Sequence, residues 1–321
     1  MNSNSEFFLK DSGFVDLYLG HDYTDIKGMI GANNRLAPAP TNLLSDIKRI
    51  KQDCLNKYES EKRNEFSTFF DGRLYRVTVT KDVYKNLSFV IRQTPSCIFS
   101  LQKVGLTSEF IELITDANKS GLVLVSGNMG TGKTTTAASI ISHRIETSGL
   151  LGVSIEDPIE TLLGGSHGDG RCIQLEVLEN EGYSLALKRA LRMGANNILI
   201  GEIRDAKTAH EVLKASLNGA FVVATIHANN CIDAIERYSI FCSEINNNAN
   251  AIISKSLFIV TNQKLVPAIR NNILAGYTVT VNGYDIQSNT TIQAKIKDGK
   301  FVALKDDFES INQQKIRYLS K

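Results

Sequence analysis

The stretch that decides the fold of this chain is Gly127-Asn128-Met129-Gly130-Thr131-Gly132-Lys133-Thr134. It fits the pattern G-x-x-x-x-G-K-[ST], in which glycines let the backbone turn tightly and aim its N–H groups at phosphate oxygens. An apolar run at residues 122–125 predicts a strand before it, and a helix is expected to begin near Thr134. The positive N-terminal end of that helix favours an anion. The sequence therefore predicts a nucleotide-binding loop rather than a glycine-rich turn without a ligand.

Two side chains of this loop have predicted chemical roles. Lys133 is expected to reach the β- and γ-phosphates of ATP, and the hydroxyl of Thr134 is expected to bind Mg²⁺. The predicted nucleotide-binding residues are Gly127, Asn128, Met129, Gly130, Thr131, Gly132, Lys133, Thr134 and Thr135.

The composition is that of a globular chain with nearly balanced charge. Of its 321 residues, 42% are hydrophobic, enough for a packed core in one large or two ordinary domains. Lys and Arg number 36 against 34 Asp and Glu, so no direct nucleic-acid binding is expected. Five scattered cysteines without a C-x-x-C pair argue against a zinc site or a disulfide framework, and favour a reducing cytosol.

The sequence also bears on membranes. The N-terminal residues lack the basic-then-apolar pattern of a signal peptide. Apolar runs such as residues 220–225 are too short to span a bilayer, so no transmembrane segment is expected. Any membrane role is therefore expected to be peripheral, through partners.

The first part of the chain predicts a small α+β domain. Asp71-Gly72 indicates the turn of a hairpin. Periodicity predicts one helix and three strands, at residues 43–58, 66–70, 74–79 and 87–92. These elements give an N-terminal domain over residues 1–97, followed by a linker over residues 98–108.

From Leu122 onward, apolar strands alternate with helices, which predicts a parallel sheet covered on both faces. The strands are expected at residues 122–125, 150–155, 198–200 and 221–226, and the helices at 134–145, 183–192 and 205–217. Asp205 is expected to cap the last of these helices. The second domain is predicted over residues 109–321, with a C-terminal extension from about 268. In it, strands are expected at 278–281 and 301–304.

Hydrolysis of a bound nucleotide needs groups that hold Mg²⁺, orient water and neutralise the γ-phosphate. Because strand ends of a parallel sheet converge on the ligand crevice, polar residues directly after each strand are candidates. They are Glu156, Asp157, Glu160, Glu202, Arg204 and His227. One of the first three carboxylates is a candidate general base, and a solvated acidic turn is the alternative. His227 is a candidate sensor of the γ-phosphate, and a structural histidine is the alternative.

Together these blocks resemble the secretion-ATPase superfamily of type II and type IV secretion and of type IV pilus motors. The family has a phosphate loop, an acidic box, a G-E-x-R-D loop and a histidine box, and this sequence carries them in order at Gly127–Thr134, Ile155–Glu160, Gly201–Asp205 and Thr225–His227. Residues 174–177 and 262–267 resemble its Q-x-E-V and N-Q-x-L-x-P segments. The resemblance implies an α/β fold, in which a PAS-like N-terminal α+β domain precedes a RecA-like P-loop NTPase domain.

The resemblance also implies roles for five residues. Glu160 would be the general base, Glu202 would support Mg²⁺ and the water network, and His227 would link the nucleotide to the moving domain interface. Arg76 and Arg92 would be candidate arginine fingers, with surface arginines as the alternative. The implied cofactors are ATP and Mg²⁺.

The resemblance further implies a ring hexamer in which ATP is clamped between the N-terminal and C-terminal domains and hydrolysis moves one against the other. Its partners would be inner-membrane or cytoplasmic components of a secretion, conjugation or pilus machine. The chain would be cytoplasmic and peripherally recruited to the cytoplasmic face of the inner membrane.

Two tasks remain open within this family. The first is a hexameric traffic ATPase for type IVB-like secretion or conjugative transfer, and the alternative is a type IV pilus retraction ATPase. Residues 193–197 replace the acidic stretch common in retraction motors, and residues 268–275 depart from their A-I-R-N-L-I-R-E segment. Both departures favour the first task. Alternatives from other classes are a nucleotide-binding scaffold and a nucleic-acid motor.

Overall fold

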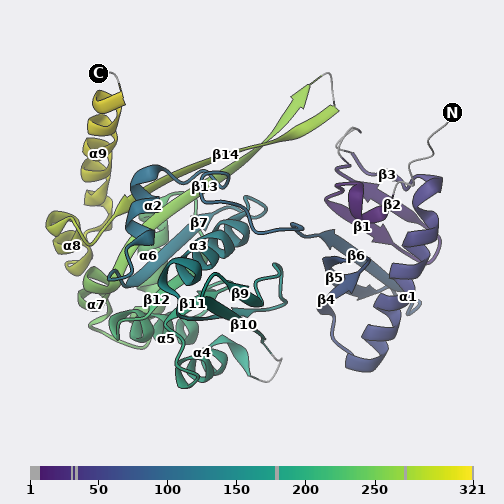
Figure 1. Cartoon of the computed structure of the whole chain (residues 1–321), viewed down its shortest axis with the longest axis horizontal. Coiled ribbons are helices and arrows are strands. Elements are labelled where there is room, and N and C mark those ends of the chain that lie inside the picture. The colour runs from purple at the N-terminus through teal and green to yellow at the C-terminus, as the bar shows by residue number, and fades with distance from the viewer. Residues whose placement is uncertain (1–7, 30–31, 33–34, 178–180, 271–272, 320–321) are drawn as a thin grey trace. The chain divides into compact units, whose positions relative to one another are not determined.

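The protein is described by a computed structural model covering residues 8–29, 32, 35–177, 181–270 and 273–319 (Figure 1). The chain divides into two compact units. The first unit contains residues 1–97, 157–162 and 266–278. The second unit contains residues 98–156, 163–265 and 279–321.

The first unit contains a six-stranded sheet in the order β3-β2-β1-β6-β5-β4, in which neighbouring strands run antiparallel. Its strands are β1 (Asp16–Leu19), β2 (Thr24–Lys27), β3 (Ala37–Pro38), β4 (Glu65–Phe70), β5 (Arg73–Lys81) and β6 (Leu87–Gln93). Short 3-10 turns lie at Leu9–Asp11 and Thr41–Leu43. The expected helix is α1 (Leu44–Glu61), and the expected hairpin is β4 and β5.

Alternation along the strands gives this sheet one apolar and one polar face. Tyr75 and Val77 of β5 are buried in the same core as Ile47 and Ile50 of α1. Arg76 lies between Tyr75 and Val77 in the strand, and so projects from the opposite face. That face is the one on which both candidate arginine fingers stand.

The second unit contains an eight-stranded sheet in the order β14-β13-β7-β12-β11-β8-β10-β9. The pairs from β13 to β10 are parallel, and β9 runs antiparallel to β10 at one edge. The strands are β7 (Gly121–Gly127), β8 (Leu151–Glu156), β9 (Gly165–His167), β10 (Gly170–Glu176), β11 (Asn197–Ile200), β12 (Phe221–His227), β13 (Leu257–Arg270) and β14 (Ile273–Asp285). The predicted α/β class with a parallel sheet is confirmed, with a mixed edge.

Helices cover both faces of this sheet. Successive residues of β7 point to opposite faces, so they belong to two different cores. Val123 and Val125 share a core with α2 (Ser108–Thr115) and α3 (Lys133–Ser148). Leu122 and Leu124 share the other core with α4 (Gly182–Arg192), α5 (Ala206–Leu217), α6 (Cys231–Ser243) and α7 (Ala249–Ser256). Among the described residues, no helix combines the length and apolar character needed to cross a membrane.

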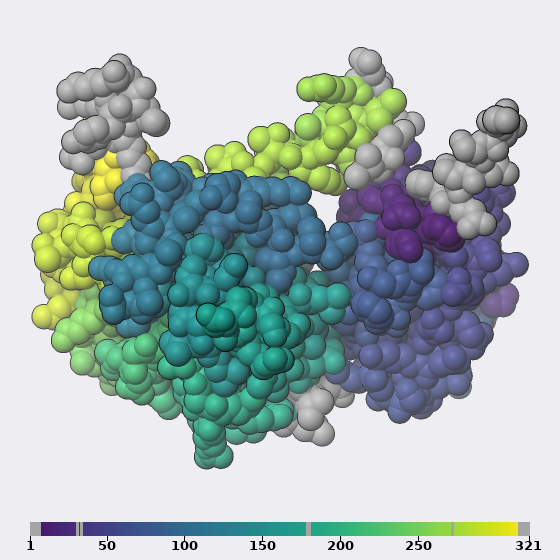
Figure 2. Space-filling model, viewed as in Figure 1, coloured from purple at the N-terminus to yellow at the C-terminus, as the bar shows by residue number. Residues whose placement is uncertain are grey.

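The C-terminal part corrects one prediction. The strand expected at residues 301–304 is wrong, because this stretch is a 3-10 turn (Phe301–Ala303) that leads into α9 (Leu304–Leu319). Leu304 and Phe308 are both buried at helical spacing, and Phe308 stacks on Tyr284 with ring centroids 3.7 Å apart. Helix α8 (Thr290–Lys297) packs on α7, and Figure 2 shows their green and yellow-green surfaces side by side.

Candidate nucleotide-binding site

The predicted phosphate loop connects β7 to α3, and Gly127 and Gly132 occupy positions in it where a larger residue would be strained or crowded. Gly127 has φ +154°, and a Cβ there would lie 2.5 Å from the carbonyl oxygen of Gln263. Gly132 has φ +84° and forms the N-cap of α3. The loop thus lies close against β13, and an anion at the start of α3 is favoured by the helix dipole. The local geometry therefore fits a nucleotide phosphate.

The Lys133 ammonium is held against this loop. Its Nζ donates to the carbonyl oxygen of Asn128 at 2.9 Å and lies 3.3 Å from Nδ1 of His227. The hydroxyl of Thr131 donates to the same Asn128 oxygen at 2.9 Å. Lys133 is only 8% exposed. The loop thus holds a nearly buried cation where a phosphate would bind.

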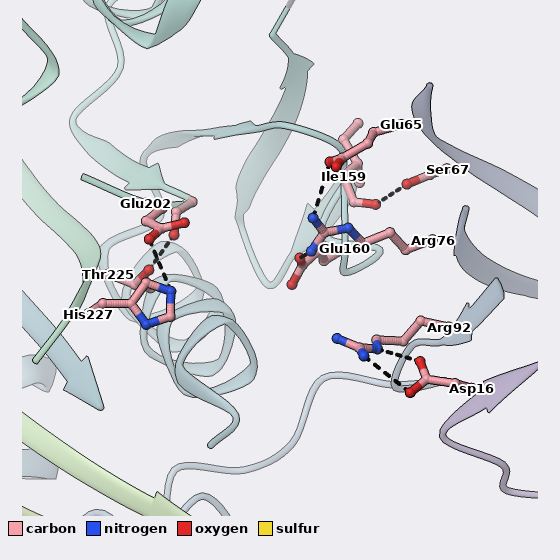
Figure 3. A network of polar contacts seen from close by, with 11 residues as sticks. Asp16, Glu65, Ser67, Arg76, Arg92, Ile159, Glu160, Glu202, Thr225 and His227 are labelled. Carbon is pink, nitrogen blue, oxygen red and sulfur yellow. Dashed lines mark hydrogen bonds and ion pairs between the residues drawn. The ribbon is translucent and has the colours of Figure 1, made fainter. Parts of the chain in front are cut away.

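Parallel strand register brings two further predicted residues, Glu202 and His227, to the same edge of the sheet, and Figure 3 shows their contact. His227, the last residue of β12, lies directly beside Gly127 of β7. Glu202 follows β11, the neighbour of β12, and its Oε1 lies 3.1 Å from Nε2 of His227. The hydroxyl of Thr225 donates to the Gly201 carbonyl at 2.5 Å, which fixes the start of the Glu202 loop. Lys133, His227 and Glu202 therefore form one continuous polar network within the second unit.

Burial lowers the pKa of His227 below the ordinary histidine value, and the adjacent Lys133 ammonium and Arg237 lower it further, against the opposing effect of Glu202. The imidazole is therefore neutral near pH 7. In that state Nε2–H donates to Glu202, and Nδ1 accepts from Lys133. We assign this tautomer from the partners of the two ring nitrogens.

This shift predicts a pH dependence of stability. Because the pKa of His227 in the folded chain lies below the ordinary 6.5, the unfolded chain binds a proton at this residue at a higher pH than the folded chain does. The contribution of His227 to the free energy of unfolding should thus fall as the pH drops through about 6.5, and level off below the folded pKa. Urea unfolding at pH 7.5 and 5.5 measures this loss, which should be smaller in His227→Gln. An equal loss in both proteins would contradict the assignment.

The structure separates the three carboxylates of the acidic box. Glu156, the last residue of β8, is 1% exposed, and its Oε1 accepts from Ser154 Oγ at 3.0 Å and from Gln174 Nε2 at 3.3 Å. Asp157 and Glu160 belong to the first unit by their contacts. There Asp157 lies 3.4 Å from Arg63, and Glu160 accepts from Arg76 at 2.5 Å. The predicted general base is thus ion-paired with a predicted arginine finger.

The two arginines stand side by side on the polar face of the first sheet (Figure 3). Register places Asp16, Arg92, Arg76 and Ser67 directly opposite one another on four neighbouring strands. Arg92 binds both carboxylate oxygens of Asp16, at 2.8 and 3.2 Å. That hydrogen bonding raises the pKa of Arg92, and the charges of Asp16 and Glu160 add to the effect. The acidic side chains offset the repulsion that two paired arginines would otherwise cause.

The other polar residues at the strand exits have structural contacts. Asp205 caps α5 as predicted, since its Oδ1 accepts from the backbone N–H of Thr208 at 2.8 Å. Arg204 lies over the ring of Tyr183, with 5.6 Å to the centroid. In the described part of the chain, no group of three or more His, Cys, Asp and Glu side chains could hold a metal ion.

Sequence reasoning gave no role to two amides on β13. Asn262 and Gln263 lie beside Ser126 and Gly127 of β7 in parallel register. Both are buried and hydrogen-bonded to the elements around the phosphate loop. Two adjacent amides at the end of an apolar strand run were the available signal, because buried amides need specific partners.

This fold and loop define the class of the protein, a P-loop nucleotide-binding α/β protein. The type II/IV secretion system protein family matches residues 80–300, and the chain belongs to that family. The type IV pilus retraction ATPase PilT of Pseudomonas aeruginosa is 32% identical over 196 residues, which are 60% of this chain and 55% of that relative. The type IV pilus ATPase PilU of the same organism is 30% identical over 247 residues, 73% of this chain and 63% of the relative. The matches thus span less than two thirds of either relative.

Solved structures share the fold over most of the chain. The crystal structure of the pilus retraction motor PilT with bound ADP is 26% identical, with a TM-score of 0.75, and the match covers 94% of this chain and 87% of that one. The X-ray structure of the Legionella pneumophila ATPase DotB is 19% identical, with a TM-score of 0.67, over 91% of this chain and 83% of that one.

Proposed function

We propose that this chain is an ATPase that converts ATP to ADP and phosphate and uses the reaction to drive a membrane-embedded secretion, conjugation or pilus machine. The observation that carries the proposal is the network of Lys133, His227 and Glu202 at the phosphate loop. Membership of a family that includes pilus and secretion ATPases supports it.

In this proposal the second unit binds the nucleotide. The loop N–H groups and the Lys133 ammonium hold the phosphates, as electrostatic groups preorganised for a polyanion. Thr134 and Glu202 would hold Mg²⁺, which neutralises charge on the phosphates when bound. Two protein ligands suffice, because Mg²⁺ in such sites takes its other ligands from phosphates and water. His227 would report the state of the γ-phosphate through its contacts with Lys133 and Glu202.

The catalytic step would use residues of the first unit. Glu160 is proposed as the general base that takes a proton from the attacking water. Arg76 and Arg92 are proposed as the arginine fingers that stabilise charge on the transferred phosphoryl group. To serve in this way, Arg76 must exchange its contact with Glu160, and Arg92 its contact with Asp16.

We further propose that the chain assembles as a homo-hexamer, is cytoplasmic, and is recruited to the cytoplasmic face of the inner membrane by components of its machine. Similarity to PilT and DotB over most of this chain supports a shared architecture. Hydrolysis would then shift the two domains by a hinge motion, which is a common response to loss of γ-phosphate contacts.

Two machines are candidates. Residues 193–197 lack the acidic stretch common in retraction motors, which favours type IVB-like secretion or conjugative transfer. Similarity to the retraction motor PilT in sequence and structure favours pilus retraction. Of the divergent segment 268–275, residues 271–272 lie outside the described residues.

The test replaces the native gene in its host with a Glu160→Gln copy, and scores plasmid transfer, protein secretion and surface motility side by side. Loss of transfer or secretion with normal motility is expected for the first machine. Loss of motility with excess pili would assign the chain to retraction. If all three phenotypes stay normal while the purified Glu160→Gln variant hydrolyses no ATP, the proposed motor function is wrong.

A further inference from the structure

Gln263 of β13 bridges the phosphate loop and the helix that follows it. Its Nε2 donates to the carbonyl oxygen of Thr131 at 2.6 Å, and its Oε1 accepts from the hydroxyl of Thr136 on α3 at 2.6 Å. The residue is 3% exposed. Both ends of one buried amide are therefore used, one on each side of the start of α3.

The first of these bonds orients a phosphate-binding group. Because the peptide unit is planar and trans, the carbonyl of Thr131 and the N–H of Gly132 point in opposite directions. Gln263 holds the Thr131 carbonyl toward β13, so the Gly132 N–H is directed away from β13. Gly132 is the last residue of the loop before Lys133, and its N–H is one of the donors expected to face phosphate.

The surroundings make this arrangement specific for glutamine. Asn262 donates to the hydroxyl of Ser126 at 3.0 Å and to the carbonyl of Ala228 at 3.2 Å, which ties β13 to the ends of β7 and β12. The Gln263 backbone is thus fixed in register beside Gly127. The amide offers a donor to Thr131 and an acceptor to Thr136 together, whereas leucine offers neither and an ionised glutamate lacks the donor.

We propose that Gln263 is a positioning residue for nucleotide binding, which holds the phosphate loop in the conformation that accepts the β- and γ-phosphates. It acts through the loop backbone and not by touching the reacting atoms. The inference rests on the proposed ATPase function, because it deepens the assignment of the same site.

The test measures dissociation constants of ATP and ADP with Mg²⁺ on the full chain, together with kcat and KM for hydrolysis. Gln263→Leu is expected to raise both dissociation constants and KM about 10-fold, because the Thr131 carbonyl loses the buried hydrogen bond that orients it, while kcat changes less than about threefold. The matched control is Thr261→Val on the same strand, whose buried hydroxyl has no hydrogen-bond partner in the described structure. The control should bind like the wild type.

Gln263→Glu provides a second variant that keeps the side-chain shape. Burial raises the pKa of a carboxyl group, and once protonated this glutamate regains a donor for Thr131. Nucleotide affinity relative to the wild type at the same pH should therefore recover as the pH falls from 8 to 6. A merely structural contribution would show no such recovery.

The outcomes distinguish failure of the proposed ATPase function from failure of the positioning role of Gln263. If the wild type binds no nucleotide, the proposed function itself fails. If the wild type binds ATP and Lys133→Ala binds it much more weakly, but both Gln263 variants keep wild-type dissociation constants at every pH, the positioning role alone is overturned. A melting curve for each variant, with and without ADP, verifies that the compared proteins are folded.

Discussion

Replacing Lys133 with alanine is expected to weaken ATP binding roughly 30- to 150-fold, as the loss of about 2–3 kcal/mol from a charge-assisted hydrogen bond requires. Turnover should fall below detection, because the same ammonium would stabilise charge on the γ-phosphate in the transition state. The geometry supports a large effect. Lys133 is the one lysine of residues 127–134, and its Nζ is anchored on Asn128 in a nearly buried position.

A second readout makes this prediction specific to the network. The charge of Lys133 lowers the pKa of His227, so removal of that charge should raise the pKa of His227. The chemical shifts of the histidine ring protons, recorded by NMR across pH 4.5–8, measure the pKa of His227 in both proteins. The control is Lys214→Ala, an exposed lysine of α5 whose Nζ lies 2.8 Å from Glu211. If His227 titrates unchanged in Lys133→Ala, the network drawn here does not exist in solution.

The sequence predicts the second sheet well because its inner strands are buried on both faces. Residues 122–125 of β7 and 221–224 of β12 are uninterrupted apolar runs, and such runs between helices have few other interpretations. Residues 165–176 form the antiparallel β9 and β10, which carry glycine, serine and histidine and lack a clear period. Residues 301–304 were predicted as a strand because a short apolar run fits a strand and a helix start equally well.

The candidate site also contains residues that local sequence predicts and residues that it does not predict. The proximity of Glu202 and His227 could be predicted because each lies at the C-terminal end of an apolar strand, and parallel strands end at one edge. The proposed role of Gln263 depends on which strand lies beside β7. That pairing joins segments far apart in the sequence, since Asn262 and its partner Ser126 are 136 residues apart. The pairing of Arg92 with Asp16 likewise depends on the register of β1 and β6. Patterns of local spacing contain no information on such pairs.

Replacing Glu160 with glutamine is expected to leave ATP binding intact while lowering turnover about 10²- to 10⁴-fold, the usual contribution of a general base. Glutamine has the same shape, and its amide oxygen can still accept the hydrogen bond that Arg76 donates to Oε1 at 2.5 Å. The position of the side chain should thus be retained while its basicity is lost. Phosphate release and the dissociation constant for ATP, measured on the same preparation, separate the two effects.

Two other glutamates, Glu65 and Glu156, provide the comparison that decides which carboxylate is the general base. Glu65 also contacts Arg76, at 3.4 Å, so Glu65→Gln perturbs the same arginine without touching the proposed base and should keep most of the turnover. Glu156 is the alternative base in the acidic box, but its Oε1 already accepts from Ser154 and Gln174. If Glu156→Gln abolishes turnover and Glu160→Gln does not, the base is Glu156, and the Arg76–Glu160 pair is a structural contact of the first unit.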